Sequence, residues 1–190
     1  LFVLLLLPSA VAAGQHPGTP LRILVLGDSL TAGYGLAPQE AFPAQLEVAL
    51  QASGYDVKVV NSGVSGDTTA GGLARLDWAL ADEPQVVIVE LGGNDALRGL
   101  PPEQTRKNLD AIITRLKRER VAVLLTGMRA PRNLGSDYYS KFDDLYPNLA
   151  EKHDVALYPF FLEGVATDPA YNQNDGIHTN SVGVRVIVRN

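Results

Sequence analysis

Four short polar clusters in this chain combine glycine, carboxylate, amide, hydroxyl and imidazole groups. The clusters span residues 27–30, 61–68, 92–95 and 175–178. Acyl transfer needs a hydroxyl nucleophile, a base for its proton, a carboxylate that fixes the tautomer of the base, and donors for the developing oxyanion. The four clusters together contain every one of these groups, so acyl transfer is the chemistry that they favour.

The nucleophile, the base and the carboxylate have one candidate residue each, and the oxyanion has three candidate donors. Ser29 is the candidate nucleophile, because it follows a predicted strand at a turn where backbone N–H groups are free. His178 is the candidate base, and Asp175, three residues earlier, can accept a hydrogen bond from its Nδ1–H. The candidate oxyanion donors are the backbone N–H groups of Ser29 and Gly66 and the side-chain amide of Asn94.

Each candidate also has an ordinary structural interpretation. Ser29 could cap the helix that follows it, and Gly66 could serve only a turn. Asn94 and its neighbour Asp95 could be loop or cap residues. Asp175 could form a turn with the glycine that follows it. These interpretations are each reasonable alone, but all of them together are a poor account of four clusters in one chain.

The histidine count favours His178 as the base. The chain has three histidines, and His16 lies in a predicted linker while His153 ends a helical pattern. Only His178 combines a loop position with a carboxylate at short spacing. A second serine, Ser65, lies in a near match to Gly-x-Ser-x-Gly, but Asp67 stands where the last glycine is required, so we do not expect Ser65 to be the nucleophile.

From residue 21 onward, short apolar runs alternate with helical patterns. Strands are predicted at 21–26, 57–60, 86–89, 121–125 and 155–158, and helices over 42–50, 73–80, 109–116 and 142–149. This alternation with short connections predicts a parallel sheet with helices on both faces. The first three clusters directly follow strands and the fourth follows the last one, so all four should meet at the carboxyl edge, where such sheets bind ligands.

The composition of the chain limits the classes of protein to which it can belong. A chain of 190 residues with 46% apolar content forms one domain with a sizeable core. Sixteen basic against 21 acidic residues give a net charge of −5 without a basic block, which excludes typical nucleic-acid binders. The absence of cysteine excludes disulfides, thiolate metal sites and a cysteine nucleophile. Neither glycine-rich nucleotide-binding motif is present.

Residues 1–13 are typical of a secretory signal peptide. The apolar run of residues 1–7 is followed by Ala10 and Ala12 in an Ala-x-Ala pattern. The run is far shorter than the ~20 residues of a membrane-spanning helix. It lacks a basic segment and a starting Met, so we expect it to be clipped at the N-terminus. We expect residues 14–20 to be a linker, 21–190 the catalytic domain, and the protein to be periplasmic or secreted without a membrane anchor. The alternative is a buried strand or helix of the fold.

Taken in order, the four clusters resemble the sequence blocks of the GDSL or SGNH hydrolase family. Ser29 lies in the first block, Gly66 in the second, Asn94 in the third, and Asp175 and His178 in the fifth. The match extends from residue 23 to residue 178. Residues 31–36, 65–68 and 97–99 further resemble the periplasmic thioesterase I/lysophospholipase branch of the family, which includes arylesterases.

This resemblance implies an α/β fold, a three-layer sandwich whose flavodoxin-like parallel sheet has five strands in the order 2-1-3-4-5. It implies a serine hydrolase that cleaves acyl and aryl esters and thioesters through an acyl-enzyme, with no metal or organic cofactor. It also implies that the loop 96–100 moves when an acyl chain binds. The expected partner is a small acyl ester or thioester, and we expect the protein to be a monomer.

The C-terminal segment departs from the family pattern. Thr179 follows the candidate base where the family usually has proline. The family then has a long amphipathic helix, whereas residues 181–188 are β-branched and contain Gly183, which predicts a poor helix. We therefore expect a weakly supported histidine loop and a C-terminus that is truncated or altered.

Three other functions compete with this interpretation. A carbohydrate acetylesterase would use the same triad on acetylated sugars. A metallophosphoesterase would use Asp28, Asn94, Asp175 and His178 as ligands, although two-metal sites usually need several histidines. A module that only binds acyl groups would have no need for the serine, asparagine, aspartate and histidine set.

Overall fold

The computed structural model describes residues 18–190, so the predicted signal peptide (1–13) and most of the predicted linker (14–20) lie outside the described residues. The sheet contains five parallel strands in the order β2-β1-β3-β4-β5, as the family resemblance implied. The strands are β1 (Leu21–Gly27), β2 (Val57–Gly63), β3 (Val86–Glu90), β4 (Ala122–Thr126) and β5 (Ala156–Tyr158). The predicted α/β class and strand order are therefore confirmed.

The strand register brings the candidate clusters to one edge of the sheet. Gly27, at the end of β1, pairs with Gly63 at the end of β2 and with Glu90 at the end of β3. The loops that follow these three strands therefore begin side by side. β1 is the central strand of these three, and its residues 24–26 are fully buried, as expected for a strand that is covered on both faces.

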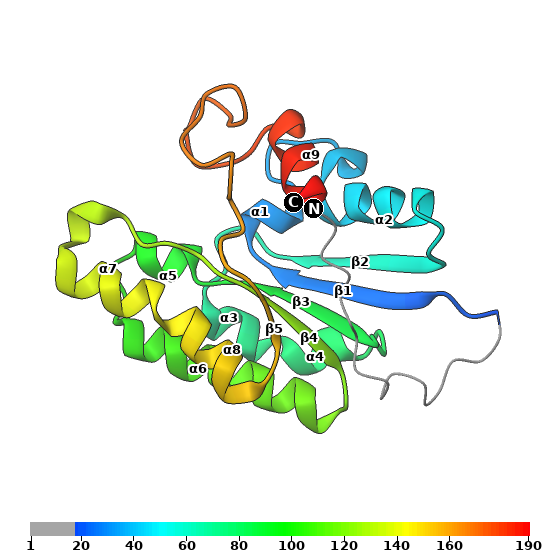
Figure 1. The fold of residues 1–190 in the computed structure, drawn as a ribbon, viewed down its shortest axis with the longest axis horizontal. Coiled ribbons are helices and arrows are strands. Elements are labelled where there is room, and N and C mark those ends of the chain that lie inside the picture. The colour runs from blue at the N-terminus through cyan, green and yellow to red at the C-terminus, as the bar shows by residue number, and fades with distance from the viewer. Residues whose placement is uncertain (1–17) are drawn as a thin grey trace.

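Helices cover both faces of the sheet (Figure 1). α1, α2 and α9 lie on one side, and α3, α4, α6 and α8 lie on the other. The α-helices are α1 (Ser29–Ala32), α2 (Phe42–Ala52), α3 (Thr69–Ala74), α4 (Leu76–Leu80), α5 (Gly93–Leu97), α6 (Pro102–Arg118), α7 (Ser136–Asp143), α8 (Leu145–His153) and α9 (Ser181–Arg189). Within residues 18–190, two short 3₁₀ turns, η2 (Pro38–Glu40) and η3 (Arg132–Leu134), complete the elements. None of the helices in the described part of the chain is long and apolar enough to span a membrane.

Two helices predicted as continuous are each divided in two. The predicted helix 73–80 breaks at Arg75, whose guanidinium is bound to the strand ends described below. The predicted helix 142–149 breaks at Asp144, between α7 and α8. Pro147 explains the second break, because its ring clashes with the carbonyl four residues earlier, that of Asp143.

The C-terminal segment is a helix, and the prediction of a poor helix there was wrong. The Asn180 side chain caps α9, accepting hydrogen bonds from the N–H groups of Val182 and Gly183 at 2.9 and 3.0 Å. Val184 is buried, and α9 packs against α2. Gly183 lies so close to the Tyr171 carbonyl that a Cβ would overlap it. Tertiary packing and the cap therefore override a weak helix propensity.

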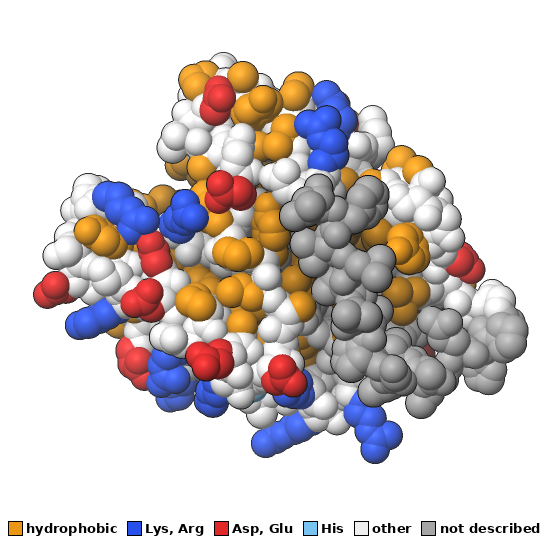
Figure 2. Space-filling view, viewed as in Figure 1, with side chains coloured by type: hydrophobic (Ala, Val, Ile, Leu, Met, Phe, Trp, Pro, Cys, Tyr) orange, Lys and Arg blue, Asp and Glu red, His pale blue; other side chains and the backbone are white. Residues whose placement is uncertain are grey.

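Charged side chains of both signs share the surface over α6 to α8. Figure 2 shows Lys and Arg next to Asp and Glu along the lower rim of this face. Ion pairs join Lys152 to Asp110 and Arg106 to Glu103 there. Neither sign of charge dominates this part of the surface.

Candidate active site

The structure brings the predicted nucleophile, base and carboxylate into direct contact. Ser29 Oγ lies 2.9 Å from His178 Nε2, although the two residues are 149 positions apart in the chain. His178 Nδ1 lies 2.7 Å from Asp175 Oδ2. Both ring nitrogens therefore have the partners that a serine triad requires.

Ser29 stands at the start of α1, and its neighbour Asp28 is the capping residue. Asp28 Oδ1 accepts a hydrogen bond from the Leu30 N–H at 3.0 Å. The ordinary interpretation of Ser29 as the helix cap is therefore wrong, because the preceding carboxylate has that task. The Ser29 hydroxyl is left to contact His178.

Asp175 orders its own loop while it contacts the imidazole. Its Oδ1 accepts from the N–H groups of Ile177 and His178 at 2.9 and 3.0 Å, and its Oδ2 faces the ring. The backbone hydrogen bond from His178, followed by the side-chain bond to the same residue, lowers the pKa of the Asp175 carboxyl to about 2. The geometry of Asp175 is thus compatible with both the turn interpretation and the catalytic interpretation.

The three candidate oxyanion donors follow β1, β2 and β3: Ser29 begins α1, Gly66 lies in the loop after β2, and Asn94 lies in the first turn of α5. Asn94 Nδ2 donates one hydrogen bond to Asp28 Oδ2 at 2.9 Å, which leaves its second amide hydrogen available. Gly66 has φ +80°, and its carbonyl accepts from Arg98 at 2.8 Å. Within residues 18–190, the N–H groups of Ser29 and Gly66 donate to no protein acceptor.

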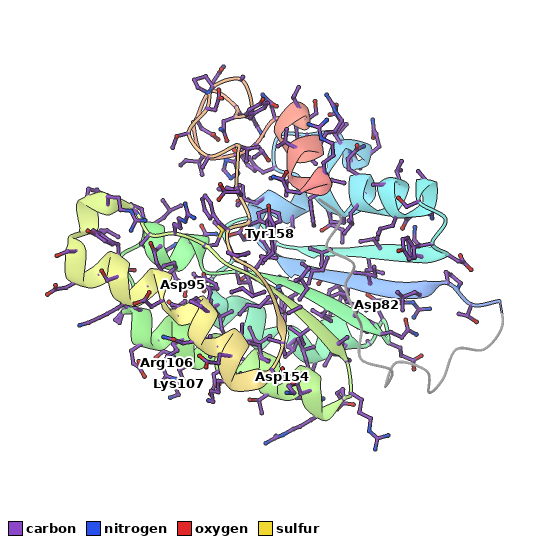
Figure 3. All side chains as sticks on the ribbon, in the orientation of Figure 1. Asp82, Asp95, Arg106, Lys107, Asp154 and Tyr158 are labelled. Carbon is purple, nitrogen blue, oxygen red and sulfur yellow. The ribbon has the colours of Figure 1, made fainter. Side chains whose placement is uncertain are left out.

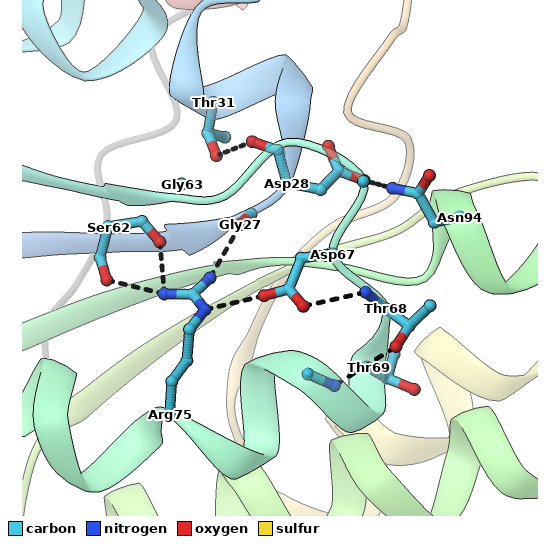
Figure 4. A network of polar contacts seen from close by, with 12 residues as sticks. Gly27, Asp28, Thr31, Ser62, Gly63, Asp67, Thr68, Thr69, Arg75 and Asn94 are labelled. Atoms are coloured by element: carbon cyan, nitrogen blue, oxygen red, sulfur yellow. Dashed lines mark hydrogen bonds and ion pairs between the residues drawn. The ribbon is translucent and has the colours of Figure 1, made fainter.

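Arg75 ties the strand ends together beneath these loops, as Figure 4 shows. Its Nη2 donates to the Gly27 carbonyl at 2.9 Å and its Nη1 to the Ser62 carbonyl at 2.8 Å. Its Nε pairs with Asp67 at 2.7 Å, in the same loop as Gly66. Sequence reasoning missed Arg75, and the only signal was an arginine placed between the apolar residues of a predicted helix.

Asp95 is a buried anchor rather than a loop residue. It accepts from the Thr69 N–H at 2.9 Å, from the Thr69 hydroxyl at 2.5 Å and from the Thr105 hydroxyl at 3.2 Å. These bonds fasten α5, which carries Asn94, to α3 and α6. Figure 3 shows Asp95 on the inner side of α6, whereas Arg106 and Lys107 project from its outer side.

Tyr34 is a further residue that sequence reasoning did not assign. Its ring lies 4.5 Å from the His178 ring, centroid to centroid, with an interplanar angle of 35°. Gln173, in the loop that carries the histidine, donates to the Tyr34 carbonyl at 2.7 Å. The segment after α1 therefore contacts the histidine loop through both a ring and a backbone group.

The groups considered as metal ligands are paired with one another instead. His178 faces Ser29 and Asp175, and Asn94 donates to Asp28. Among residues 18–190, no three His, Asp or Glu side chains are grouped so that they could hold a metal ion. The geometry thus supports the triad interpretation of these residues.

Comparisons with known proteins agree with this geometry. The model of the GDSL-like lipase/acylhydrolase family matches residues 25–186. An arylesterase of Vibrio mimicus is 46% identical over 158 residues, which cover 83% of this chain and 79% of the relative. Thioesterase 1/protease 1/lysophospholipase L1 of Escherichia coli K12 is 44% identical over 181 residues, covering 95% and 82%. The crystal structure of AlinE4, an SGNH-hydrolase family esterase, is 50% identical, with a TM-score of 0.81 and coverage of 92% and 94%.

Proposed function

This chain belongs to the GDSL-like lipase/acylhydrolase family and is a serine ester hydrolase, and we propose that Ser29, His178 and Asp175 are its catalytic triad. The observation that carries the proposal is the pair of contacts at His178, 2.9 Å to the Ser29 hydroxyl and 2.7 Å to the Asp175 carboxylate. In such a triad the imidazole takes the proton of the hydroxyl, while the carboxylate holds the ring in the correct tautomer and stabilises its charged form.

The reaction proceeds through an acyl-enzyme. His178 Nε2 takes the proton of Ser29 Oγ as that oxygen bonds to the substrate carbonyl carbon, and the carbonyl oxygen becomes an oxyanion. The N–H groups of Ser29 and Gly66 and the amide of Asn94 donate to that oxyanion. His178 then returns the proton to the departing alcohol or thiol, and water repeats the sequence on the acyl-enzyme.

We propose acyl and aryl esters and thioesters as the substrates. The arylesterase and thioesterase/lysophospholipase names of the relatives support this class. Four exposed apolar side chains lie near the site residues in space or in sequence. Tyr34 contacts His178, and Ile177 directly precedes it. Val64 lies two residues before Gly66, and Leu97 lies three residues after Asn94. They offer an apolar acyl or aryl group a surface beside the nucleophile.

A fluorophosphonate label and an ester panel test this proposal. We expect the label to map to Ser29 and to be lost in Ser29→Ala, whose kcat falls by more than ~10³. Ser65→Ala is the matched control, and it should label and turn over as the unaltered protein does. p-Nitrophenyl esters of increasing chain length should be cleaved beyond acetate. Label on another residue contradicts the triad, and activity confined to acetate points instead to a carbohydrate acetylesterase.

We also propose that the protein is exported to the periplasm or secreted and acts there as a monomer. The apolar run of residues 1–7 and the Ala10 and Ala12 pattern support export. Expression of the chain with its N-terminal segment, followed by fractionation and N-terminal sequencing, tests this. We expect an extracytoplasmic product that starts after Ala13, and an uncleaved cytoplasmic product contradicts export. Sedimentation of that product tests the monomer.

A further inference from the structure

Gln173 lies opposite His178 in the loop of residues 168–180. An antiparallel bridge between Asn172 and Thr179 closes this loop, and directly beyond the bridge the Gln173 N–H donates to the His178 carbonyl at 2.8 Å. Gln173 itself is half-buried. Because this backbone hydrogen bond joins the two residues, a displacement of Gln173 moves His178 as well.

The Gln173 side chain connects this loop to the segment that carries the proposed nucleophile. Its Nε2 donates one hydrogen to the Tyr34 carbonyl at 2.7 Å and the other to the Thr179 carbonyl, in its own loop, at 3.0 Å. The Tyr34 N–H in turn donates to the Ser29 carbonyl at 3.1 Å. A chain of hydrogen bonds thus joins the backbone of Ser29 to that of His178 through two intermediate residues.

Gly35 makes room for the Gln173 side chain. It has φ +73°, in the left-handed region, and a Cβ at this position would overlap the Gln173 amide oxygen. Tyr34, directly before it, also places its ring 4.5 Å from the His178 ring, centroid to centroid. The turn after α1 therefore contacts the loop through a carbonyl and a ring of one residue.

Within residues 18–190, two hydrogen bonds join this loop to the segment between β1 and α2. One is the contact of His178 Nε2 with the Ser29 hydroxyl, and the other is the bond from Gln173 to the Tyr34 carbonyl. The first contains the reacting atoms, so it cannot persist through a catalytic cycle. The second contains none of them and can persist throughout.

The bond between Ser29 and His178 is lost when the acyl-enzyme forms. The serine oxygen is then an ester oxygen without a hydrogen, and the neutral ring carries its hydrogen on Nδ1, toward Asp175. Two acceptors face each other and cannot bond. His178 Nε2 must nevertheless stay beside the ester, because it takes the proton of the attacking water. Of the two hydrogen bonds, the one from Gln173 is left to hold the loop in place.

We propose that Gln173 is a positioning residue, which holds His178 beside the acyl-enzyme and thereby sets the rate of deacylation. The inference rests on the proposed function and deepens it. Gln173 does not touch the reacting atoms. Its loss should slow the attack of water more than the attack of Ser29 on the ester, because the serine hydroxyl still contacts His178 in the free protein.

Gln173→Met, which has a similar length but no donor, tests the proposal on a p-nitrophenyl ester. In an acyl-enzyme reaction kcat/KM reports acylation, whereas kcat also contains deacylation. We expect kcat to fall about 10–30-fold while kcat/KM stays within about 3-fold, so that KM falls with kcat. A burst of about one p-nitrophenolate per protein molecule should precede the steady state. Equal losses in kcat and kcat/KM, or an unchanged kcat, overturn the proposal.

Gln173→Glu and Asn174→Ala separate this effect from a general disturbance of the loop. An ionised glutamate keeps the shape of the side chain but offers the two carbonyls no donor, so kcat and KM should fall as in Gln173→Met. Asn174 is an exposed amide of the same loop, and its substitution should leave kcat and KM unchanged. Melting temperatures show that the fold is kept. A similar fall in Asn174→Ala, or none in Gln173→Glu, contradicts the role of the Gln173 amide.

The decay of the acyl-enzyme measures deacylation directly. After excess ester is removed, acid quenching and peptide mass mapping follow the acyl group on Ser29, which should leave about 10–30-fold more slowly in Gln173→Met. If no acyl group reaches Ser29 and Ser29→Ala keeps its activity, the proposed function fails. If the acyl group maps to Ser29 and decays equally fast in both proteins, only the role of Gln173 fails.

Discussion

At the scale of single residues, the site depends on which atoms carry hydrogens. Asp175 contacts His178 Nδ1, so that nitrogen holds the ring hydrogen and Nε2 is free to take the Ser29 proton. The same carboxylate accepts two backbone N–H groups of its loop. Catalytic and structural effects of Asp175 can therefore be separated by choosing a substitution that keeps one of its two oxygens.

Asp175→Asn should lower kcat on the order of 10³–10⁴-fold. Asparagine can still accept the loop N–H groups, but its amide faces Nδ1 as a donor, which moves the ring hydrogen to Nε2 and blocks proton transfer from Ser29. The measurement is kcat on p-nitrophenyl esters, with circular dichroism to show that the fold is kept. A fully active Asp175→Asn contradicts the assigned tautomer.

The same residue gives a pH dependence of stability. The pKa of Asp175 is about 2 in the folded protein and 3.8 in its unperturbed state. The lowered value means that Asp175 stabilises the fold above pH ~4 and loses this effect as the pH falls toward 2. The unaltered protein should therefore lose melting temperature more steeply than Asp175→Asn across this interval. Parallel curves contradict the shift.

Asn94→Ala should lower kcat by about 10²–10³ while KM changes little, because one oxyanion donor is lost. Asn148→Ala is the matched control, since Asn148 is exposed on α8, and its kcat should not change. Fluorophosphonate labelling of Ser29 should persist in Asn94→Ala at a lower rate. A loss below about 3-fold removes Asn94 from the set of donors.

The sequence predicts those site residues that belong to a recognisable motif or have a characteristic spacing. Ser29 is a candidate because it directly follows a strand, and Asp175 and His178 are candidates because a loop histidine has a carboxylate three residues before it. Arg75 and Glu90 were missed, since nothing local distinguishes a buried arginine or a buried carboxyl from a solvated one. Only the tertiary structure shows that Arg75 donates to two strand-end carbonyls and that Glu90 accepts from the Asp28 N–H.

At the scale of elements, the site is held by contacts between loops and strand ends. The ion pair of Arg75 and Asp67 is mostly buried, with side-chain exposures of 18% and 11%. Arg75 also bonds to the carbonyls at the ends of β1 and β2. The position of the loop that carries Gly66 therefore depends on one guanidinium from the junction of α3 and α4.

Arg75→Met should lower the free energy of unfolding by about 3 kcal/mol, because it leaves Asp67 unpaired and the strand-end carbonyls without their donor. It should also lower kcat as the Gly66 loop loosens. Arg115→Met is the matched control, since Arg115 pairs with Asp77 and Glu119 at the surface, and it should cost less than about 1 kcal/mol. Urea unfolding measures both, and equal costs contradict the buried role.

Helix α9 shows why propensity alone misled the sequence prediction. β-branched residues and Gly183 disfavour a helix by local measures, yet the Asn180 cap and the burial of Val184 and Ile187 stabilise it. The glycine that weakens the helix also allows its approach to Tyr171. Gly183 therefore lowers the helix propensity of this segment but is required for the close packing of α9 against Tyr171.

Gly183→Ala should destabilise the protein by about 1–3 kcal/mol, because its Cβ overlaps the Tyr171 carbonyl. Helix propensity alone predicts the opposite, a gain of about 1 kcal/mol. Val182→Ala, at an exposed position of the same turn, is the control and should stay within about 0.5 kcal/mol. Stabilisation by Gly183→Ala in urea unfolding contradicts the close approach.

At the scale of the whole molecule, the proposed triad joins the buried sheet to a loop that is mostly exposed. Ser29 follows β1, the core of which is fully buried, whereas His178 lies in a loop that projects beyond the sheet between β5 and α9 (Figure 1). We call residues 168–180 the histidine arm. Asn172 and Thr179 are its buried positions, and most of residues 173–178 are exposed.

The histidine arm should open before the sheet unfolds, because local opening exposes little apolar surface whereas global unfolding exposes the core. In increasing urea, activity at saturating substrate should therefore fall at a lower concentration than the far-ultraviolet dichroism of the sheet and helices. Hydrogen exchange should be faster at residues 173–178 than in β1 and β3. A covalent phosphonate on Ser29 provides the control, since contacts between its oxygens and His178 should slow exchange in the arm and leave β1 unchanged. Coincident loss of activity and dichroism, with equal exchange in the arm and the sheet, contradicts this order of events and makes the arm part of one cooperative unit.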